Sequence, residues 1–192
     1  MKRKIVKYSL MAITILTAGS MTAFAQQHQH GNQHNNLRSP YVEQLDSPVR
    51  GLSESEVDNL LNGQGAGYAR MAELNGYPGP LHVLDLRSPL NLSAQQTKEI
   101  QAVFEQMQSR AKSLGQTIVT KEQKLSDAFA SDSITNAELE KQTIELAQLY
   151  GQLRKTHLQA HLQINPLLSA EQIQKYNEIR GYEVKKSTNL NL

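Results

Sequence analysis

The sequence predicts an all-α protein built around a long antiparallel helical hairpin with short flanking helices. The first observation is an apolar stripe, in steps of three and four residues, that extends from Ser93 to about Phe129. The second is that the segment opening this stripe, Leu92-Ser93-Ala94-Gln95-Gln96, returns as Leu168-Ser169-Ala170-Glu171-Gln172 after another helical stretch. Each copy places a Ser N-cap three residues before a Gln, which is the spacing of a capping box.

Residues 1–25 are typical of a secretory signal peptide that is cleaved after Ala25. Four Lys and Arg residues within the first seven positions precede an apolar run, and Ala23-Phe24-Ala25 forms an A-x-A cleavage site. The alternative is an uncleaved membrane anchor, for which the apolar run is short. We therefore expect a periplasmic protein without stable membrane insertion after cleavage.

Charge and cysteine content limit the classes of function. Cleavage would remove four of the 20 Lys and Arg residues and none of the 18 Asp and Glu residues, which changes the formal net charge from +2 to −2. Nucleic-acid-binding proteins normally have a basic surface, so nucleic acid is not an expected partner. The chain has no cysteine, so an exported fold must be held by packing without disulfides.

Residues 26–50 are polar and rich in His, Gln and Asn, and we expect a disordered arm there. His28, His30 and His34 belong to it. They form either a loose metal-binding tail or part of a solvated linker, since short His tracts bind transition metals without a fixed geometry. A flexible tail is also expected at residues 183–192.

The helical domain is expected over residues 51–182. Before the first long helix, the sequence predicts short helices at 53–63 and about 66–74 and a short amphipathic segment at 81–86. Ser53 and Glu56 form a capping box for the first of these, and Gly63 ends it. The segment from Gly76 to Pro80 is typical of a rigid turn.

The first long helix carries apolar residues on one side. They are Ile100, Phe104, Met107, Ala111, Leu114, Ile118, Leu125 and Phe129. At roughly 1.5 Å per residue this helix would be about 55 Å long, and a helix of that length needs a packing partner.

The second long helix is expected from Thr135, with Glu138 as its capping partner, to about Ile164. It carries two apolar strips, which suits a helix that contacts its hairpin partner on one side and another surface on the other. The inward strip is Leu139, Leu146, Tyr150 or Leu149, Leu153, His157, Ala160 and Ile164, and the flanking strip is Ile144, Ala147, Leu158 and Leu162. A last helix is expected from Ala170 to Arg180.

A tight turn near residue 132 would place Gly115 opposite Gly151. Small residues at one level let two helices approach closely, so we expect the closest contact of the hairpin there. The same pairing places His157 and His161 beside Met107 and Phe104.

The two Leu-(Ser/Thr)-x-x-Gln motifs, which flank a long hairpin behind a signal peptide, resemble the LTxxQ motifs of the Spy/CpxP family of periplasmic proteins. The resemblance covers roughly residues 81–182. The matching residues are Leu92, Ser93 and Gln96, then Leu168, Ser169 and Gln172. Ser stands where Thr is commoner, and segment 51–80 is not part of the well-known members. We interpret the motif residues as structural, because they cap helices and Gln96 and Gln172 can hydrogen-bond across the joint.

The resemblance implies a four-helix LTxxQ-type subunit that forms a cradle-shaped homodimer. It also implies a stress protein, acting either by ATP-independent chaperone-type binding of unfolded clients or by envelope-stress signalling through a sensor kinase. Apolar strips left uncovered on a thin hairpin would hold such clients loosely. Cations beside these strips would assist, namely Arg110, Lys112, Lys121 and Lys124.

The alternative function is binding or sensing of a heavy metal such as Zn, Ni, Co or Cu. His157 and His161 lie one helical turn apart, a spacing that suits two ligands of one ion, and His82, Met107 or Glu105 could add a third. The resemblance supports this, because metal-sensing relatives build sites from His, Glu and Met at the open end of the hairpin. The other interpretation is that both histidines pack at a dimer or hairpin seam. No cofactor is required for the fold.

No enzyme activity is predicted. The sequence contains no metalloprotease motif and no obvious pair of catalytic carboxylates. The glycines from Gly63 to Gly67 follow no strand and precede no Lys-Ser/Thr pair, so helix termination explains them better than phosphate binding.

Overall fold

The computed structural model describes residues 38–182, and every regular element within that range is helical. The expected all-α fold, with a long helix and several shorter ones, is confirmed. In chain order the elements are η1 (Val42–Asp46), α1 (Glu54–Asn62), α2 (Arg70–Leu74), α3 (Pro80–Asp85), α4 (Ala94–Ala130), α5 (Asn136–Ile164), η2 (Asn165–Leu167) and α6 (Ala170–Arg180). The predicted signal peptide, the three histidines of the predicted arm and the predicted tail at 183–192 lie outside the described residues.

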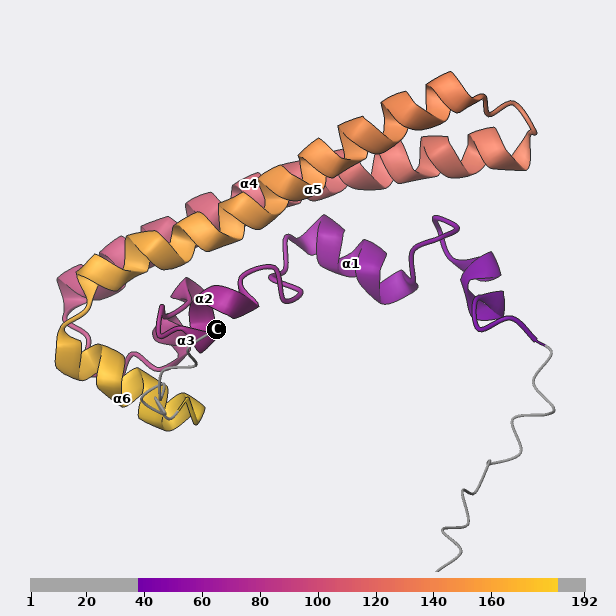
Figure 1. Cartoon of the computed structure of the whole chain (residues 1–192). Helices are drawn as coiled ribbons and strands as arrows, with labels where there is room; N and C mark the ends of the chain where they lie inside the picture. Colours follow the sequence, from indigo (N-terminus) through magenta and orange to yellow (C-terminus); the bar gives the residue numbers. More distant parts are fainter. Residues whose placement is uncertain (1–37, 183–192) are drawn as a thin grey trace, which may run out of the picture. The chain divides into compact units, whose positions relative to one another are not determined.

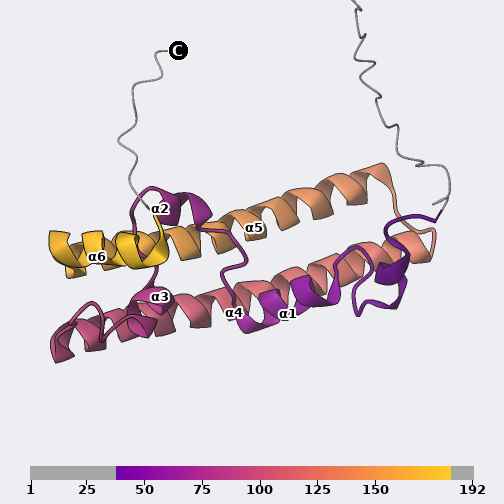
Figure 2. The same cartoon turned by 90° about the horizontal axis from the view of Figure 1, so that it is seen from below.

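Helices α4 and α5 have 37 and 29 residues and run side by side in opposite directions from the turn at 131–135 (Figures 1 and 2). Ser93 and Thr135 are their N-caps, and each side chain accepts a hydrogen bond from the backbone N–H three residues on. Near the turn, Lys121 pairs with Glu145 across the two helices. Among the described helices, none combines the length and the apolar character that a membrane span requires.

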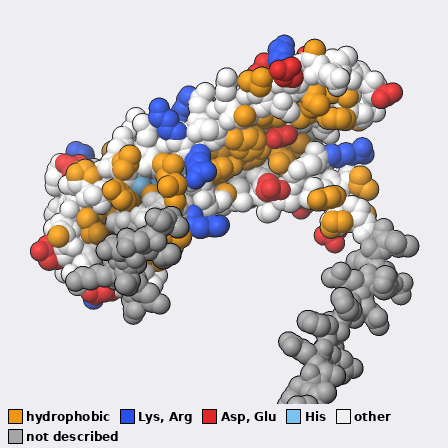
Figure 3. All heavy atoms as spheres, in the orientation of Figure 1, with side chains coloured by type: hydrophobic (Ala, Val, Ile, Leu, Met, Phe, Trp, Pro, Cys, Tyr) orange, Lys and Arg blue, Asp and Glu red, His pale blue; other side chains and the backbone are white. Residues whose placement is uncertain are grey.

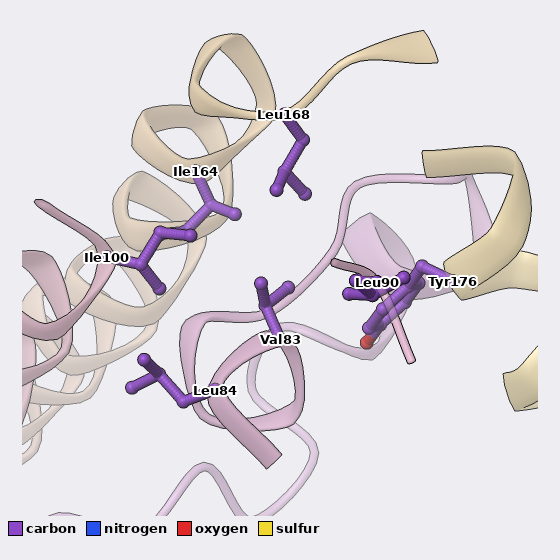
Figure 4. Close-up of a cluster of buried hydrophobic side chains, with 7 residues drawn as sticks. All are labelled: Val83, Leu84, Leu90, Ile100, Ile164, Leu168 and Tyr176. Atoms are coloured by element: carbon purple, nitrogen blue, oxygen red, sulfur yellow. The ribbon is translucent and has the colours of Figure 1, made fainter. Parts of the chain in front are cut away.

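Two clusters of buried side chains hold the fold. The joint core lies where α3, α6 and the adjoining ends of α4 and α5 meet (Figure 4). Its buried members are Val83, Leu84, Leu90, Ile100, Ile164, Leu168 and Tyr176. The central core joins α1 to the middle of the α4–α5 pair, and its buried members are Leu60, Ala111, Leu114, Ile118, Leu146 and Leu153.

The close contact predicted between Gly115 and Gly151 is wrong. A Cβ atom on Gly115 would lie 1.9 Å from the backbone oxygen of Leu60, so this glycine admits α1 against α4. A Cβ atom on Gly151 would meet nothing within 4 Å. The general rule that small residues permit close helix approach holds at Gly115. Helix α1, which precedes the hairpin in the chain, occupies the position beside Gly115 that the prediction gave to α5.

Two expected boundaries also change. Val49 is 2% exposed and η1 precedes it, so the structured part of the chain begins before the end of the arm expected at residues 26–50. Helix α2 begins at Arg70 rather than near residue 66, because Ala66 and Gly67 have φ angles of 39° and 81°. Left-handed backbone of this kind cannot continue a right-handed helix.

Candidate functional site

The two sequence motifs meet at the joint. Gln96 Nε2 donates to Leu167 O and to Gln172 Oε1, both at 2.8 Å. Gln172 Nε2 donates to Leu90 O at 3.2 Å. Each Gln side-chain oxygen also accepts from the backbone N–H of its own N-cap, Ser93 or Ser169. Together they tie the start of α4 to the start of α6.

The motif leucines contribute apolar contacts beside these hydrogen bonds. Leu168 is 8% exposed within the joint core, and Leu92 is partly buried against that core. Ser93 and Ser169 each accept from the Gln backbone N–H three residues on, at 3.1 and 3.2 Å. The arrangement stabilises helix starts and offers no nucleophile–base pair.

A partly buried carboxylate, that of Glu73, lies close to this joint. Glu73 of α2 accepts hydrogen bonds from the Tyr176 hydroxyl and from Arg180 at 3.4 Å, and its Oε1 lies 3.0 Å from His82 Nδ1. Burial by itself raises the pKa of Glu73, but the Tyr176 hydrogen bond and the nearby His82 and Arg180 outweigh it and lower that pKa below the ordinary value. Burial of Tyr176, together with its hydrogen bond to the Glu73 carboxylate, raises the pKa of Tyr176.

A cavity of about 740 Å³ lies between α4, α5 and the segment from Gly63 to His82. Its wall is mainly apolar, and a few polar side chains also line it. Four of the five residues proposed from sequence as ligands of this metal site line it, namely His82, Met107, His157 and His161, whereas Glu105 is not among its lining residues. The side chains of Phe104 and Glu73 also contribute to the wall.

Two of these histidines have a defined hydrogen-bonding geometry. His161 Nδ1 lies 2.8 Å from Tyr77 O, and because a carbonyl can only accept, Nδ1 carries the proton. His82 Nδ1 faces Glu73 in the same way. In each neutral ring the Nε2 lone pair is then available for another partner. Gly79 makes room for the His161 ring, since a Cβ there would lie 2.9 Å from its Cε1.

His157 is in a different environment. Its side chain is 2% exposed, its ring stacks on Tyr68 at a centroid distance of 5.8 Å, and its Nε2 has no hydrogen-bond partner within residues 38–182. Burial, with a smaller contribution from the neighbouring His161, lowers its pKa and favours the neutral ring. Over the described range, no three His, Cys, Asp or Glu side chains are grouped so that they could hold a metal ion.

The other candidate surface is apolar and follows the α4–α5 pair. Figure 3 shows hydrophobic side chains gathered along these helices toward the 131–135 turn, with charged side chains beside them. Partly buried residues packed on the central core contribute to it, namely Val119, Leu125, Leu149 and Tyr150. Phe129, at the end of α4, is 57% exposed. We call these five residues the client face.

The cations named from sequence are distributed along α4 and are not gathered at one point. Lys121 and Lys124 form ion pairs with Glu145 and Glu138 of α5, and Arg110 donates to Gln152 at 3.3 Å. The Lys112 side chain lies against Gly63, which places it near the start of the 63–82 segment. Two of the four cations are therefore already paired with acids.

No protein-family model, no curated protein and no solved structure matches this chain. Function must therefore be inferred from the residues themselves. Sequence reasoning missed the cluster of Glu73, Tyr176 and Arg180, since a single acid in a five-residue helix forms no pattern with partners about a hundred residues away.

Proposed function

We propose that this protein is a periplasmic stress protein that binds unfolded clients without ATP. The observation that carries the proposal is the client face, which remains partly exposed beside a thin central core. Extended apolar surface of this kind is typical of interaction sites. An unfolded segment would gain by burying its apolar side chains there, at about 25 cal/mol per Å² removed from water.

The composition of the client face favours weak and reversible binding. Its residues are aliphatic or aromatic, and the Tyr150 hydroxyl donates to Glu122 at 3.0 Å, so a polar group lies beside the apolar area. Lys121 and Glu145 are each about one-third exposed at its edge. Exposed charges add little affinity and much salt dependence, so clients of differing sequence would be accepted.

The two Leu-Ser-x-x-Gln motifs support membership of the Spy/CpxP family, and with it a cradle-shaped homodimer. Two copies would cover part of the apolar surface and leave the rest on a concave side. Export is the first requirement of this function. Amino-terminal sequencing of the protein recovered from the periplasm should begin at Gln26, and an uncleaved leader would contradict the assignment.

The chaperone function is tested by light scattering of a denatured client. One dimer per client should suppress aggregation without ATP, and Phe129→Ser should weaken suppression several-fold because it removes an exposed apolar side chain. Leu162→Ser is the matched control, since Leu162 is 60% exposed but lies at the other end of α5. Unchanged aggregation with the unaltered protein rejects chaperone activity and leaves sensor-kinase signalling as the alternative.

Metal binding is the second candidate function. One observation favours it: His82 and His161 each direct Nδ1 to an acceptor, as metal-ligating histidines commonly do. The test is calorimetric titration of zinc, nickel and copper into a variant with His28, His30 and His34 changed to Asn. Adding His82→Ala and His161→Ala should abolish the remaining binding. Equal binding before and after that change removes the site.

A further inference from the structure

The cavity beside α2 combines apolar walls with one cation that has no partner in the described range. Leu74, Leu81, Phe104 and Met107 supply apolar lining. Arg70 also lines the cavity and is exposed, which places it at the opening. No hydrogen bond or ion pair joins its guanidinium to another residue within 38–182.

The backbone beside Arg70 is shaped to leave room for the guanidinium. Gly67 has a φ of 81°, and a Cβ atom at that position would lie 2.9 Å from an Arg70 terminal nitrogen. A residue with a side chain would both strain this turn and displace the Arg70 head group. The Arg70 guanidinium thus lies beside the turn that ends the glycine-rich segment, at the edge of the apolar cavity.

Glu73 is the one acid among the described residues that line the cavity, and neighbouring groups already neutralise its charge. Glu73 is bound by Tyr176, Arg180 and His82, so its charge is compensated within the protein. His157, in contrast, is 2% exposed and its Nε2 lacks a hydrogen-bond partner over the described residues. Because His157 Nε2 is itself buried, Arg70 is the charged group on the cavity wall that has no partner among the described residues.

We propose that this cavity binds a small amphipathic carboxylate, with its hydrocarbon part against Leu81, Phe104 and Met107 and its carboxylate on Arg70. The volume of about 740 Å³ falls within the usual range of ligand sites. A guanidinium pairs with a carboxylate through two parallel hydrogen bonds, which fixes the orientation of the ligand. The proposal does not depend on client binding or on metal binding.

Sodium decanoate is the probe, titrated calorimetrically into the mature full-length protein in the presence of EDTA. We expect one saturable site. Octanoate, which is two methylenes shorter, should bind about fifteenfold more weakly, because each buried methylene changes affinity about fourfold. Arg70→Gln should weaken decanoate binding about tenfold while leaving decanol binding unchanged, because decanol has no charge to lose.

Two control variants separate this site from general apolar binding. Lys98→Gln removes another exposed positive charge, on α4, and should leave decanoate affinity unchanged. Phe129→Ser alters the client face and should also leave decanoate affinity unchanged. Absence of saturable binding, an equal loss in Arg70→Gln and Lys98→Gln, or a loss in Phe129→Ser would overturn the proposal. Because Arg70 is exposed, Arg70→Gln is expected to keep the wild-type melting temperature.

Discussion

The joint and the α1 contact are two helix-packing regions held in different ways. At the joint, side-chain hydrogen bonds link distant segments: Gln96 reaches Leu167, Gln172 reaches Leu90, and His161 faces Tyr77 O. Between α1 and the α4–α5 pair, the described residues show no side-chain hydrogen bond or ion pair. Leu60 packs there against α4 through apolar contact alone.

This difference indicates different roles for the two regions. Directional hydrogen bonds specify one arrangement, because any other arrangement leaves buried polar groups without partners. Apolar contact is less specific and can be replaced by other apolar surface. The joint therefore fixes how the helices meet, whereas α1 covers a part of α4 that other apolar surface could also cover.

The largest effect is expected from Gly115→Ala, which acts on the α1 contact. The new methyl group would collide with the Leu60 backbone, and we expect a loss of about 3 kcal/mol in the free energy of unfolding, the upper range for overpacking. Urea unfolding measures the loss, and hydrogen exchange should show reduced protection confined to α1.

Gly151→Ala is the matched control for that substitution. It meets open space within a helix, so it should stabilise the protein by about 0.5–1 kcal/mol. Similar destabilisation by both alanines would show that the close approach of α1 to α4 has been misassigned.

The next largest effect is expected at the joint. Gln96→Ala removes the donor to Leu167 O and one partner of Gln172, and should cost about 2 kcal/mol. Gln101→Ala, which affects only an exposed pair with Glu105, should stay within about 0.5 kcal/mol. Chemical denaturation of Gln96→Ala, Gln172→Ala and the double variant should give a combined loss smaller than the sum. Strict additivity would mean that the two glutamines act separately.

Tyr176→Phe should have a smaller effect that depends on pH. Removing a hydrogen bond to the partly buried carboxylate of Glu73 should cost about 1.5 kcal/mol at neutral pH. Because the folded-state pKa of Glu73 is lowered, Glu73 stabilises the fold above its ordinary pKa, and this contribution is lost as pH falls through the folded-state pKa. Unfolding curves from neutral to acidic pH should therefore converge for wild type and variant. A constant difference across that range would exclude Glu73 as the cause.

The smallest effect is expected from Lys121→Gln near the turn. Its pair with Glu145 is about one-third exposed on both sides, so solvent screens it, and the free energy of unfolding should fall less than it does in Gln96→Ala or Tyr176→Phe. Thermal melts at low and high salt should show that the difference disappears at high salt. A loss comparable to that of Gln96→Ala would remove the distinction between the joint and the rest of the hairpin.

Most helix boundaries were accessible from the sequence. Ser53, Ser93, Thr135 and Ser169 act as N-caps where the spacing to Glu or Gln predicted them, and Gly63 and Gly181 adopt the left-handed C-cap conformation. The apolar stripes also correctly predicted the burial of Ile100, Ile118 and Ile164.

The candidate sites were accessible only in part. Sequence spacing selected four residues that line one cavity, but it gave no indication of Arg70 or Glu73. The sequence also predicted the wrong neighbour for Gly115. A glycine indicates that another segment can approach closely, but it does not indicate which segment does.

The sequence alone determined the caps, the helix lengths and the apolar stripes, because these depend on residues three or four positions apart. Only the tertiary structure decided that α1 covers Gly115, that Gln96 meets Gln172 across 76 residues, and that Glu73 meets Tyr176 across 103. Contacts between residues so far apart in the sequence depend on how whole helices pack. The residues around one partner do not indicate which distant residue it will meet.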